Sequence, residues 1–156
     1  MSSLTTFTGD GLLYAFSHAL KKIGIRVETV HTECSPGQCE ITYEPEFGIR
    51  AADNAHMYRT AIKEIAQKRG YIASFMSRPW PDECENAAHF NHSLWDVDGK
   101  KNVMYDPTTE LGISEVAQHW IAGILAHVPA ISLLMAPTSN CQKTYTPGTF
   151  SPRNAT

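Results

Sequence analysis

Hydrophobic residues recur every three to four positions in three stretches of the chain, and each stretch predicts an amphipathic helix. The first lies between Asp10, a candidate N-cap, and Gly24, which suits a helix end. The second covers about 53–69. The third can begin at Ser114 and continues to Pro129, which we expect to break or kink it.

Alternating apolar and polar positions predict strands between these helices. Residues 25–30 alternate, and Ser35-Pro36-Gly37-Gln38 then fits a type II turn, so a hairpin should follow. Further strands are predicted at 71–76, 88–95 and 102–105, with a turn at Asp98-Gly99 and a loop from Ala136 onward. Hairpins mixed with helices indicate an α+β domain, in which helices pack against an antiparallel sheet.

Composition removes several classes of function. The chain has 156 residues with 42% hydrophobic and 19% charged, enough for one globular domain. Its net charge of −3 gives no basic surface for nucleic acid or an anionic membrane. The first two dozen residues carry no cationic region followed by an apolar stretch, so we expect no signal peptide and a cytoplasmic protein whose four cysteines stay as thiols. The apolar stretch 120–136 is interrupted by polar residues and favours a buried helix.

Two carboxylates flank the predicted turn. A turn centred on Pro36-Gly37 places Glu33 directly opposite Glu40. Like charges in that position destabilise a hairpin unless they are solvated or surround a cation. Mg²⁺ and Mn²⁺ prefer such oxygen ligands, although a solvated pair fits the same spacing.

The segment around His89 has one polar face if it is a strand. Period two places His89, Asn91 and Ser93 on that face and apolar residues with His92 on the other. His89 would suit a carboxylate-rich metal site, and Asn91 and Ser93 could donate to phosphate oxygens. A solvent-facing strand gives the same alternation.

Five motifs in order resemble the catalytic domain of glutamine synthetase over nearly the whole chain: Glu33 with Pro36–Glu40, Phe75–Pro79, His89 with Ser93-Leu94, Ala136–Asn140, and Lys143 with Pro147-Gly148. The resemblance implies that Glu33, Glu40 and His89 are metal ligands. It places Asn91 and Ser93 in a nucleotide-contacting strand. Mg²⁺ or Mn²⁺ and ATP would be the cofactors of any retained site, and a homo-oligomer, a dodecamer at full length, would be the assembly.

The chain departs from the family pattern where glutamate should bind. Cys84-Glu85 replace an Asn-Gly pair, and Thr144 replaces an arginine that would hold the substrate carboxylate. Arginine makes a bidentate, charge-assisted pair with a carboxylate, whereas threonine offers one neutral hydroxyl. Glu85 also adds negative charge beside an anionic substrate. Asn91 stands where the family has a second histidine.

Length supports the same interpretation. The family's complete subunit is several-fold longer, so residues 1–156 are expected to be a partial catalytic domain that lacks the N-terminal β-grasp domain and the C-terminal part. We expect such a segment, taken alone, to be marginally stable or to aggregate, because it exposes surfaces that are normally covered.

Three functions remain in competition. The stretch Glu85–Asp96 resembles the non-catalytic vertebrate lens branch of the family. That likeness implies an oligomeric scaffold of lens fibre cells, with intermediate-filament or cytoskeletal partners. The alternative is an ATP- and Mg²⁺-dependent carboxylate–amine ligase, either a glutamine synthetase or a γ-glutamyl amide ligase. A third possibility is weak metal binding without chemistry.

Overall fold

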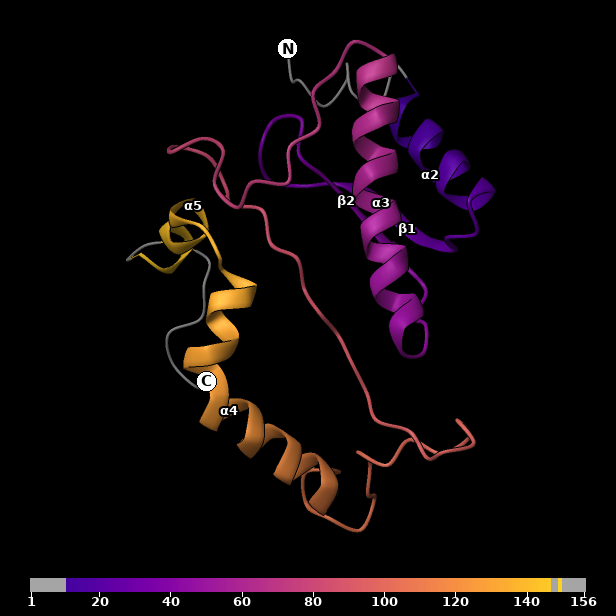
Figure 1. Ribbon diagram of the computed structural model, residues 1–156, viewed down its shortest axis with the longest axis vertical. Helices are drawn as coiled ribbons and strands as arrows, with labels where there is room; N and C mark the ends of the chain where they lie inside the picture. Colours follow the sequence, from indigo (N-terminus) through magenta and orange to yellow (C-terminus); the bar gives the residue numbers. More distant parts are fainter. Residues whose placement is uncertain (1–10, 147–148, 150–156) are drawn as a thin grey trace. The chain divides into compact units, whose positions relative to one another are not determined.

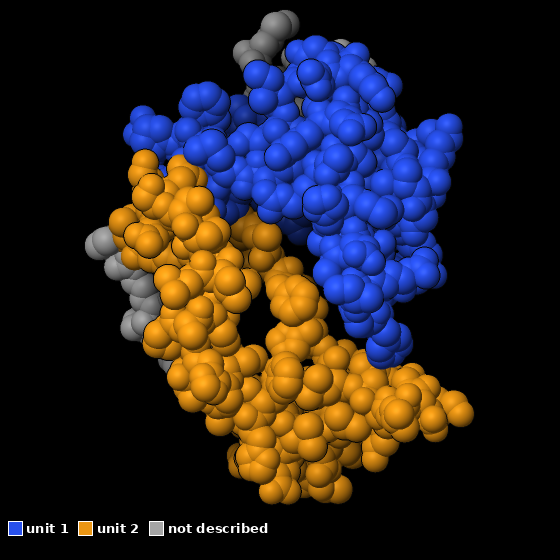
Figure 2. All heavy atoms as spheres, viewed as in Figure 1, with its two compact units in different colours: residues 1–86 blue, residues 87–156 orange. Residues whose placement is uncertain are grey.

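The computed structural model describes residues 11–146 and Thr149. The elements in chain order are α2 (Leu12–Lys22), β1 (Val27–Thr32), β2 (Cys39–Tyr43), α3 (Ile49–Lys68), α4 (Glu115–Met135), α5 (Ser139–Gln142) and the 3-10 helix η1 (Lys143–Tyr145) (Figure 1). They belong to two compact units, residues 1–86 and 87–156 (Figure 2). Helices combined with an antiparallel strand pair confirm the α+β class.

The core of the first unit lies between α2, α3 and the hairpin formed by β1 and β2. Its buried side chains are Leu12, Leu13, Phe16, Leu20, Ile25, Ile41, Ile62 and Ala66. Helical spacing gathers the apolar residues of α2 and α3 on one face of each helix. Full burial of one large apolar side chain contributes about 1.5–3 kcal/mol. The first two predicted helices are therefore confirmed, with α3 beginning at Ile49 rather than near 53.

Helices α2 and α3 end in the same hydrogen-bonding pattern. In α2 the N–H of Gly24 donates to the Lys21 carbonyl at 3.1 Å, and the N–H of Ile25 donates to the Leu20 carbonyl at 3.0 Å. This Schellman motif needs a left-handed residue, and Gly24 has φ of +87°. Gly70, with φ of +78°, ends α3 in the same way.

The helix starts agree with the sequence only in part. Ser114 is the N-cap of α4, as predicted, and its Oγ accepts the N–H of Ala117 at 3.1 Å. Asp10 lies outside the described residues, and the N-cap of α2 is Gly11, which supplies no side-chain hydrogen bond. After Ala136 the predicted loop is instead folded into the short helices α5 and η1.

Three predicted strands are wrong, because within the described ranges only β1 and β2 form a ladder. In 71–76 the alternation is real: Tyr71, Ala73 and Phe75 pack against the core while their neighbours are exposed. No second strand pairs with that segment. Segments 88–95 and 102–105 contribute only the isolated bridges Trp95–Asn102 and Tyr105–Ile113. A strand needs a hydrogen-bonded neighbour, and periodicity cannot supply one.

The turn predicted at Asp98-Gly99 is confirmed. The N–H of Gly99 donates to the Asp96 carbonyl at 2.9 Å, and Gly99 has φ of +66°. The Asp96 carboxylate accepts the backbone N–H groups of Lys100 and Lys101 at 2.7 and 3.2 Å. These hydrogen bonds hold the pKa of Asp96 below its usual value, because they favour the ionised carboxylate.

Helix α4 differs from its prediction in burial. Only Ala117 of this helix is buried, whereas Trp120, Ile121 and Leu125 are exposed, so the expected buried helix is wrong here. The physical reason is that no sheet is described in its unit against which it could pack. By length and composition α4 is the one described helix apolar enough to cross a membrane, a test that core helices of soluble proteins also pass. It continues past Pro129, and its axis bends along its length in Figure 1.

Candidate metal site and substrate region

The hairpin has a register two residues away from the predicted one. The N–H of Gln38 donates to the Ser35 carbonyl at 3.0 Å, and Gly37 has φ of +76°, so the predicted turn is present. However, the N–H of Glu33 donates to the Gln38 carbonyl at 3.0 Å. Glu40 consequently pairs with His31, and the expected Glu33–Glu40 pair is wrong. The connection holds four residues, Cys34–Gly37, instead of two.

Glu33 and Glu40 nevertheless come together on one face. Side-chain direction repeats every two residues along a strand, so a shift of two positions leaves both carboxylates on the same side. His31 Nδ1 lies 3.3 Å from Glu33 Oε1, and His31 Nε2 lies 4.0 Å from Glu40 Oε1. One ligand atom from each of the three residues lies within 4.8 Å of the others. This trio is the metal face.

The donor set of the metal face suits a divalent cation. Two carboxylates match the oxygen preference of Mg²⁺ and Mn²⁺, and a neutral imidazole shifts the preference toward Mn²⁺ and other transition ions. His31 and Glu40 are exposed and Glu33 is half-buried, so an ion can reach all three. Each ring nitrogen of His31 faces one of the two carboxylates. His31 could therefore ligate an ion through one nitrogen while the other nitrogen contacts a carboxylate.

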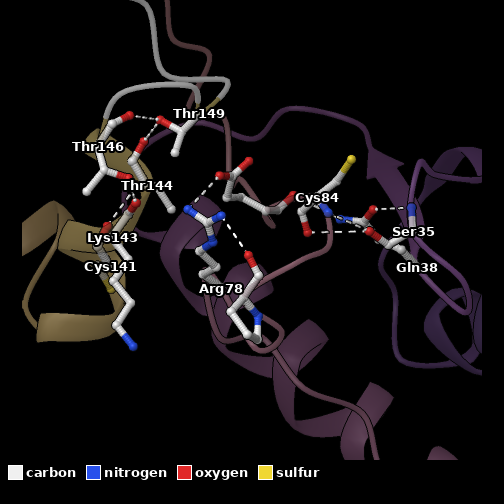
Figure 3. Close-up of polar contacts among 11 residues, drawn as sticks. Ser35, Gln38, Arg78, Cys84, Cys141, Lys143, Thr144, Thr146 and Thr149 are labelled. Atoms are coloured by element: carbon white, nitrogen blue, oxygen red, sulfur yellow. Dashed lines mark hydrogen bonds and ion pairs between the residues drawn. The ribbon is translucent and has the colours of Figure 1, made fainter.

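A polar network ties the hairpin connection to the segment at Cys84–Asn86. The buried Ser35 hydroxyl accepts the N–H of Cys84 at 2.8 Å. Gln38 Nε2 donates to the Glu85 carbonyl at 2.9 Å and to Asn86 Oδ1 at 2.8 Å. Figure 3 shows Ser35 and Gln38 facing Cys84. Ser35 and Gln38, the first and last residues of the turn, are therefore held by side-chain hydrogen bonds to the segment at 84–86 as well as by the hairpin.

The carboxylate of Glu85 is paired inside the protein. Arg78 Nη1 lies 3.4 Å from Glu85 Oε1, and Arg78 Nη2 donates to the Pro81 carbonyl at 2.8 Å (Figure 3). Only 12% of the Glu85 side chain and 23% of the Arg78 side chain are exposed. The negative charge expected at Glu85 is thus accompanied by a guanidinium, which neutralises it locally and occupies the arginine.

The other predicted ligands lie in the second unit. His89, Asn91 and Ser93 are exposed residues of an extended segment, and a common site with Glu33 and Glu40 stays a prediction. The Ser93 hydroxyl accepts the indole N–H of Trp95 at 2.9 Å. The Ser93 hydroxyl keeps its own proton for donation to a phosphate oxygen while it accepts from Trp95.

Aromatic residues fix the opposite side of this segment to α4. His92 Nε2 accepts the indole N–H of Trp120 at 2.6 Å, and the rings of Phe90 and His92 stack with centroids 5.6 Å apart. Period two predicts that Phe90 and His92 share one face, and the stacking of their rings agrees with that prediction.

Thr144 uses its side chain locally. Its hydroxyl donates to the Cys141 carbonyl at 2.7 Å, across the junction of α5 and η1. Its own carbonyl accepts the Thr149 hydroxyl (Figure 3). A threonine engaged in this way cannot reproduce the long bidentate reach of an arginine.

Three residues take part in the site beyond the candidates that the sequence singles out. His31 stands two residues before Glu33, so period two is enough to put it on the metal face. From the sequence, Gln38 belongs to a turn and a motif, and Arg78 to a motif, without an expected partner. Their contacts join positions more than forty residues apart in the case of Gln38, which local patterns do not encode.

With this geometry established, comparison with known proteins identifies the class. The family described as "Glutamine synthetase, catalytic domain" matches residues 6–156. The chain belongs to that family.

Within the family, the chain is similar to lengsin. It is 45% identical over 122 residues to lengsin of Canis lupus familiaris, covering 78% of this chain and 21% of the relative. It is 43% identical to lengsin of Homo sapiens over 122 residues, covering 78% of this chain and 23% of the relative. The glutamine synthetase of Thermotoga maritima is 37% identical over 134 residues, covering 86% and 30% respectively.

Solved structures give the same fold. The structure titled "Crystal structure of novel glutamine synthase homolog" superposes with a TM-score of 0.80 at 34% identity, over 83% of this chain and 30% of that one. The structure titled "Apo GmaS without ligand" gives a TM-score of 0.79 at 23% identity, over 85% and 31%, and supports the fold alone. The chain spans about a fifth to a third of the length of these relatives.

Proposed function

We propose that this chain is a partial catalytic domain of a glutamine synthetase-like protein that does not join ammonia to glutamate. The Arg78–Glu85 ion pair carries the proposal. A half-buried, paired carboxylate stands where the family resemblance expects a glutamate-binding Asn-Gly pair, and Thr144 stands at the expected arginine. Removing both elements costs the charge-assisted hydrogen bonds that would hold an anionic substrate, about 1.5–3 kcal/mol each.

The test is a ligase assay on the full-length protein that contains this chain. With ATP, Mg²⁺, glutamate and hydroxylamine, we expect no γ-glutamyl hydroxamate above background. A bona fide glutamine synthetase purified in parallel is the positive control. Hydroxamate formation at the rate of that control would refute the proposal.

In place of catalysis we propose an oligomeric scaffold role. The 40–45% identity to lengsins supports it, and the resemblance extends the role to lens fibre cells, to a cytoplasmic location and to intermediate-filament partners.

Two measurements test the scaffold role. Light scattering should give a homo-oligomeric mass for the full-length protein. Co-sedimentation with purified intermediate filaments, compared with sedimentation of the protein alone, should show filament-dependent pelleting. A monomer that stays in the supernatant would remove the scaffold role.

The second candidate is an ATP-dependent carboxylate–amine ligase with a different substrate. The grouping of His31, Glu33 and Glu40 favours it. A divalent cation held by these residues would supply positive charge to polarise phosphate oxygens. Mg²⁺-dependent ATP turnover with a panel of amino acids and polyamines would support it. Calorimetry that detects no nucleotide binding would eliminate it.

Weak metal binding without chemistry is compatible with either role. Glu40→Ala removes one carboxylate of the metal face and should weaken Mn²⁺ binding at least tenfold. Glu44→Ala, just beyond the opposite end of β2 and ion-paired with Arg26, is the matched control. Equal Mn²⁺ affinity for the parent and Glu40→Ala would exclude a metal at this face.

A further inference from the structure

The hairpin connection and the segment at 84–86 each carry a cysteine next to the network that joins them. Cys34 is exposed and precedes Ser35, and Cys84 is half-buried and donates its N–H to the Ser35 hydroxyl. We propose that Cys34 and Cys84 are a redox pair that closes into an intramolecular disulfide when the protein meets a small-molecule disulfide such as oxidised glutathione.

Backbone contacts hold the two positions together. Ser35 Oγ lies 2.8 Å from the Cys84 nitrogen and 3.5 Å from the Cys84 carbonyl oxygen. Gln38 adds its hydrogen bond to the Glu85 carbonyl at 2.9 Å. Residues adjacent to both cysteines are thus tied, although the cysteines are about 50 positions apart in the chain.

The two thiols influence each other. The neighbouring Cys84 side chain raises the pKa of the Cys34 thiol above its ordinary value, through hydrogen bonding and charge repulsion. A disulfide needs its two backbones close together, and the Ser35 contact with the Cys84 N–H at 2.8 Å holds the segment next to Cys34 against Cys84. Their separation along the chain means that the bond would restrict a long loop in the unfolded state, which favours the folded form.

The other two cysteines lack this arrangement. Cys39 points toward the core, and burial raises its pKa to about 11. The Cys141 sulfur contacts Thr138 Oγ1 at 3.1 Å within its own short helix. Cys141 therefore serves as the comparison residue.

The chemistry is ordinary thiol–disulfide exchange and balances without a further oxidant. The Cys34 thiolate attacks one sulfur of oxidised glutathione, which forms a mixed disulfide and releases one glutathione thiolate. The Cys84 thiolate then attacks the Cys34 sulfur, which forms the Cys34–Cys84 bond and releases the second glutathione. Two protein thiols lose two electrons and two protons, and glutathione disulfide gains both as two thiols.

Closure would lock the connection that lies between Glu33 and Glu40 of the metal face. Glu33 is the neighbour of Cys34, and Glu85 is the neighbour of Cys84. The disulfide would therefore fix the position of one carboxylate of the metal face relative to the Arg78–Glu85 pair, independently of whether a metal binds.

The test treats the folded full chain with oxidised glutathione at pH 8, quenches with acid and maps peptides by mass spectrometry without reduction. We expect one cross-linked peptide that contains Cys34 and Cys84 and disappears on adding a reducing agent. Cys34→Ser and Cys84→Ser should each abolish it and leave a glutathione adduct on the remaining cysteine. Cys141→Ser should retain the cross-link in the parent's yield.

The parent protein decides the outcome even if a variant misfolds. Stable glutathione adducts on Cys34 with no cross-link, or cross-links through Cys39 or between chains, would overturn the proposal. Circular dichroism of the reduced serine variants, compared with the reduced parent, separates loss of the partner thiol from loss of structure.

Discussion

His31 lies directly opposite Glu40 across the hairpin, with His31 Nε2 4.0 Å from the carboxylate. An imidazole in that position should raise affinity for transition ions more than for Mg²⁺. We expect His31→Ala to weaken Mn²⁺ binding about tenfold, which is about 1.4 kcal/mol, and to change Mg²⁺ binding little. Isothermal titration measures both. His18→Ala, an exposed histidine of α2, is the control. Equal losses for the two ions would show that His31 acts only through the fold.

Gln38 is the main link between the hairpin and the segment at 84–86. Its side chain accepts the N–H of Ser35 at 3.0 Å and donates to Glu85 and Asn86. Gln38→Ala should lower the free energy of unfolding by about 1–3 kcal/mol, since partly buried groups lose their partners. Urea denaturation measures the loss. Gln67→Ala on the exposed side of α3 should be nearly neutral, and equal values for both variants would contradict the network.

The Arg78–Glu85 pair should be costly to break from one side. Arg78→Ala leaves a mostly buried carboxylate without its guanidinium and should destabilise the protein by about 2–4 kcal/mol. Replacing both residues by alanine should cost less than the two single losses added together. A double-mutant cycle from urea melts measures this coupling. Additive losses would mean that the pair contributes no interaction energy.

Glycine at the end of α2 has a conformational role that another glycine lacks. Gly24 has φ of +87°, so Gly24→Ala should cost about 1 kcal/mol although no atom lies within 4 Å of the added methyl group. Gly123 lies inside α4 with equally open space. Gly123→Ala should be neutral or stabilising by up to about 1 kcal/mol. Thermal melts should show a lower melting temperature for Gly24→Ala and an unchanged or higher one for Gly123→Ala.

Stability should fall in alkaline solution because of Cys39. Burial raises its pKa from 9.0 to about 11, so the folded state keeps the proton that the unfolded state loses. This contribution is complete below pH 9 and disappears as the pH approaches 11. Its size is at most about 3 kcal/mol. Cys39→Ala should flatten the decline in unfolding free energy between pH 9 and 11, measured by urea melts. An unchanged slope would assign the decline to other groups such as Tyr58.

The sequence predicted what depends on local periodicity. The apolar faces of α2 and α3, the Ser114 cap and the Pro36-Gly37 turn all follow from neighbours a few positions apart. The register of the hairpin could not be predicted from such local patterns. The hydrogen bond from the Glu33 N–H to the Gln38 carbonyl replaces the predicted Glu33–Glu40 pairing, and the contacts of Ser35 with Cys84 favour the observed register.

Long-range partners explain the remaining differences. Residues 71–76 keep strand-like alternation but have no neighbouring strand in the described ranges, and α4 has no sheet to cover it. For the site, Glu33 and Glu40 could be grouped by period two, whereas the pairing of Glu85 with Arg78 could not. Whether His89, Asn91 and Ser93 belong to the same site stays a prediction.

The four-residue connection Cys34–Gly37 lies outside the ladder, so it is the place where this hairpin can change in length. A one-residue slip of the pairing register would instead move every side chain of β2 to the other side of the sheet, which would send Ile41 into solvent and Glu40 into the core. Insertions and deletions in homologous hairpins should therefore be absorbed within the connection, with Cys39, Ile41 and Tyr43 always on the inner side.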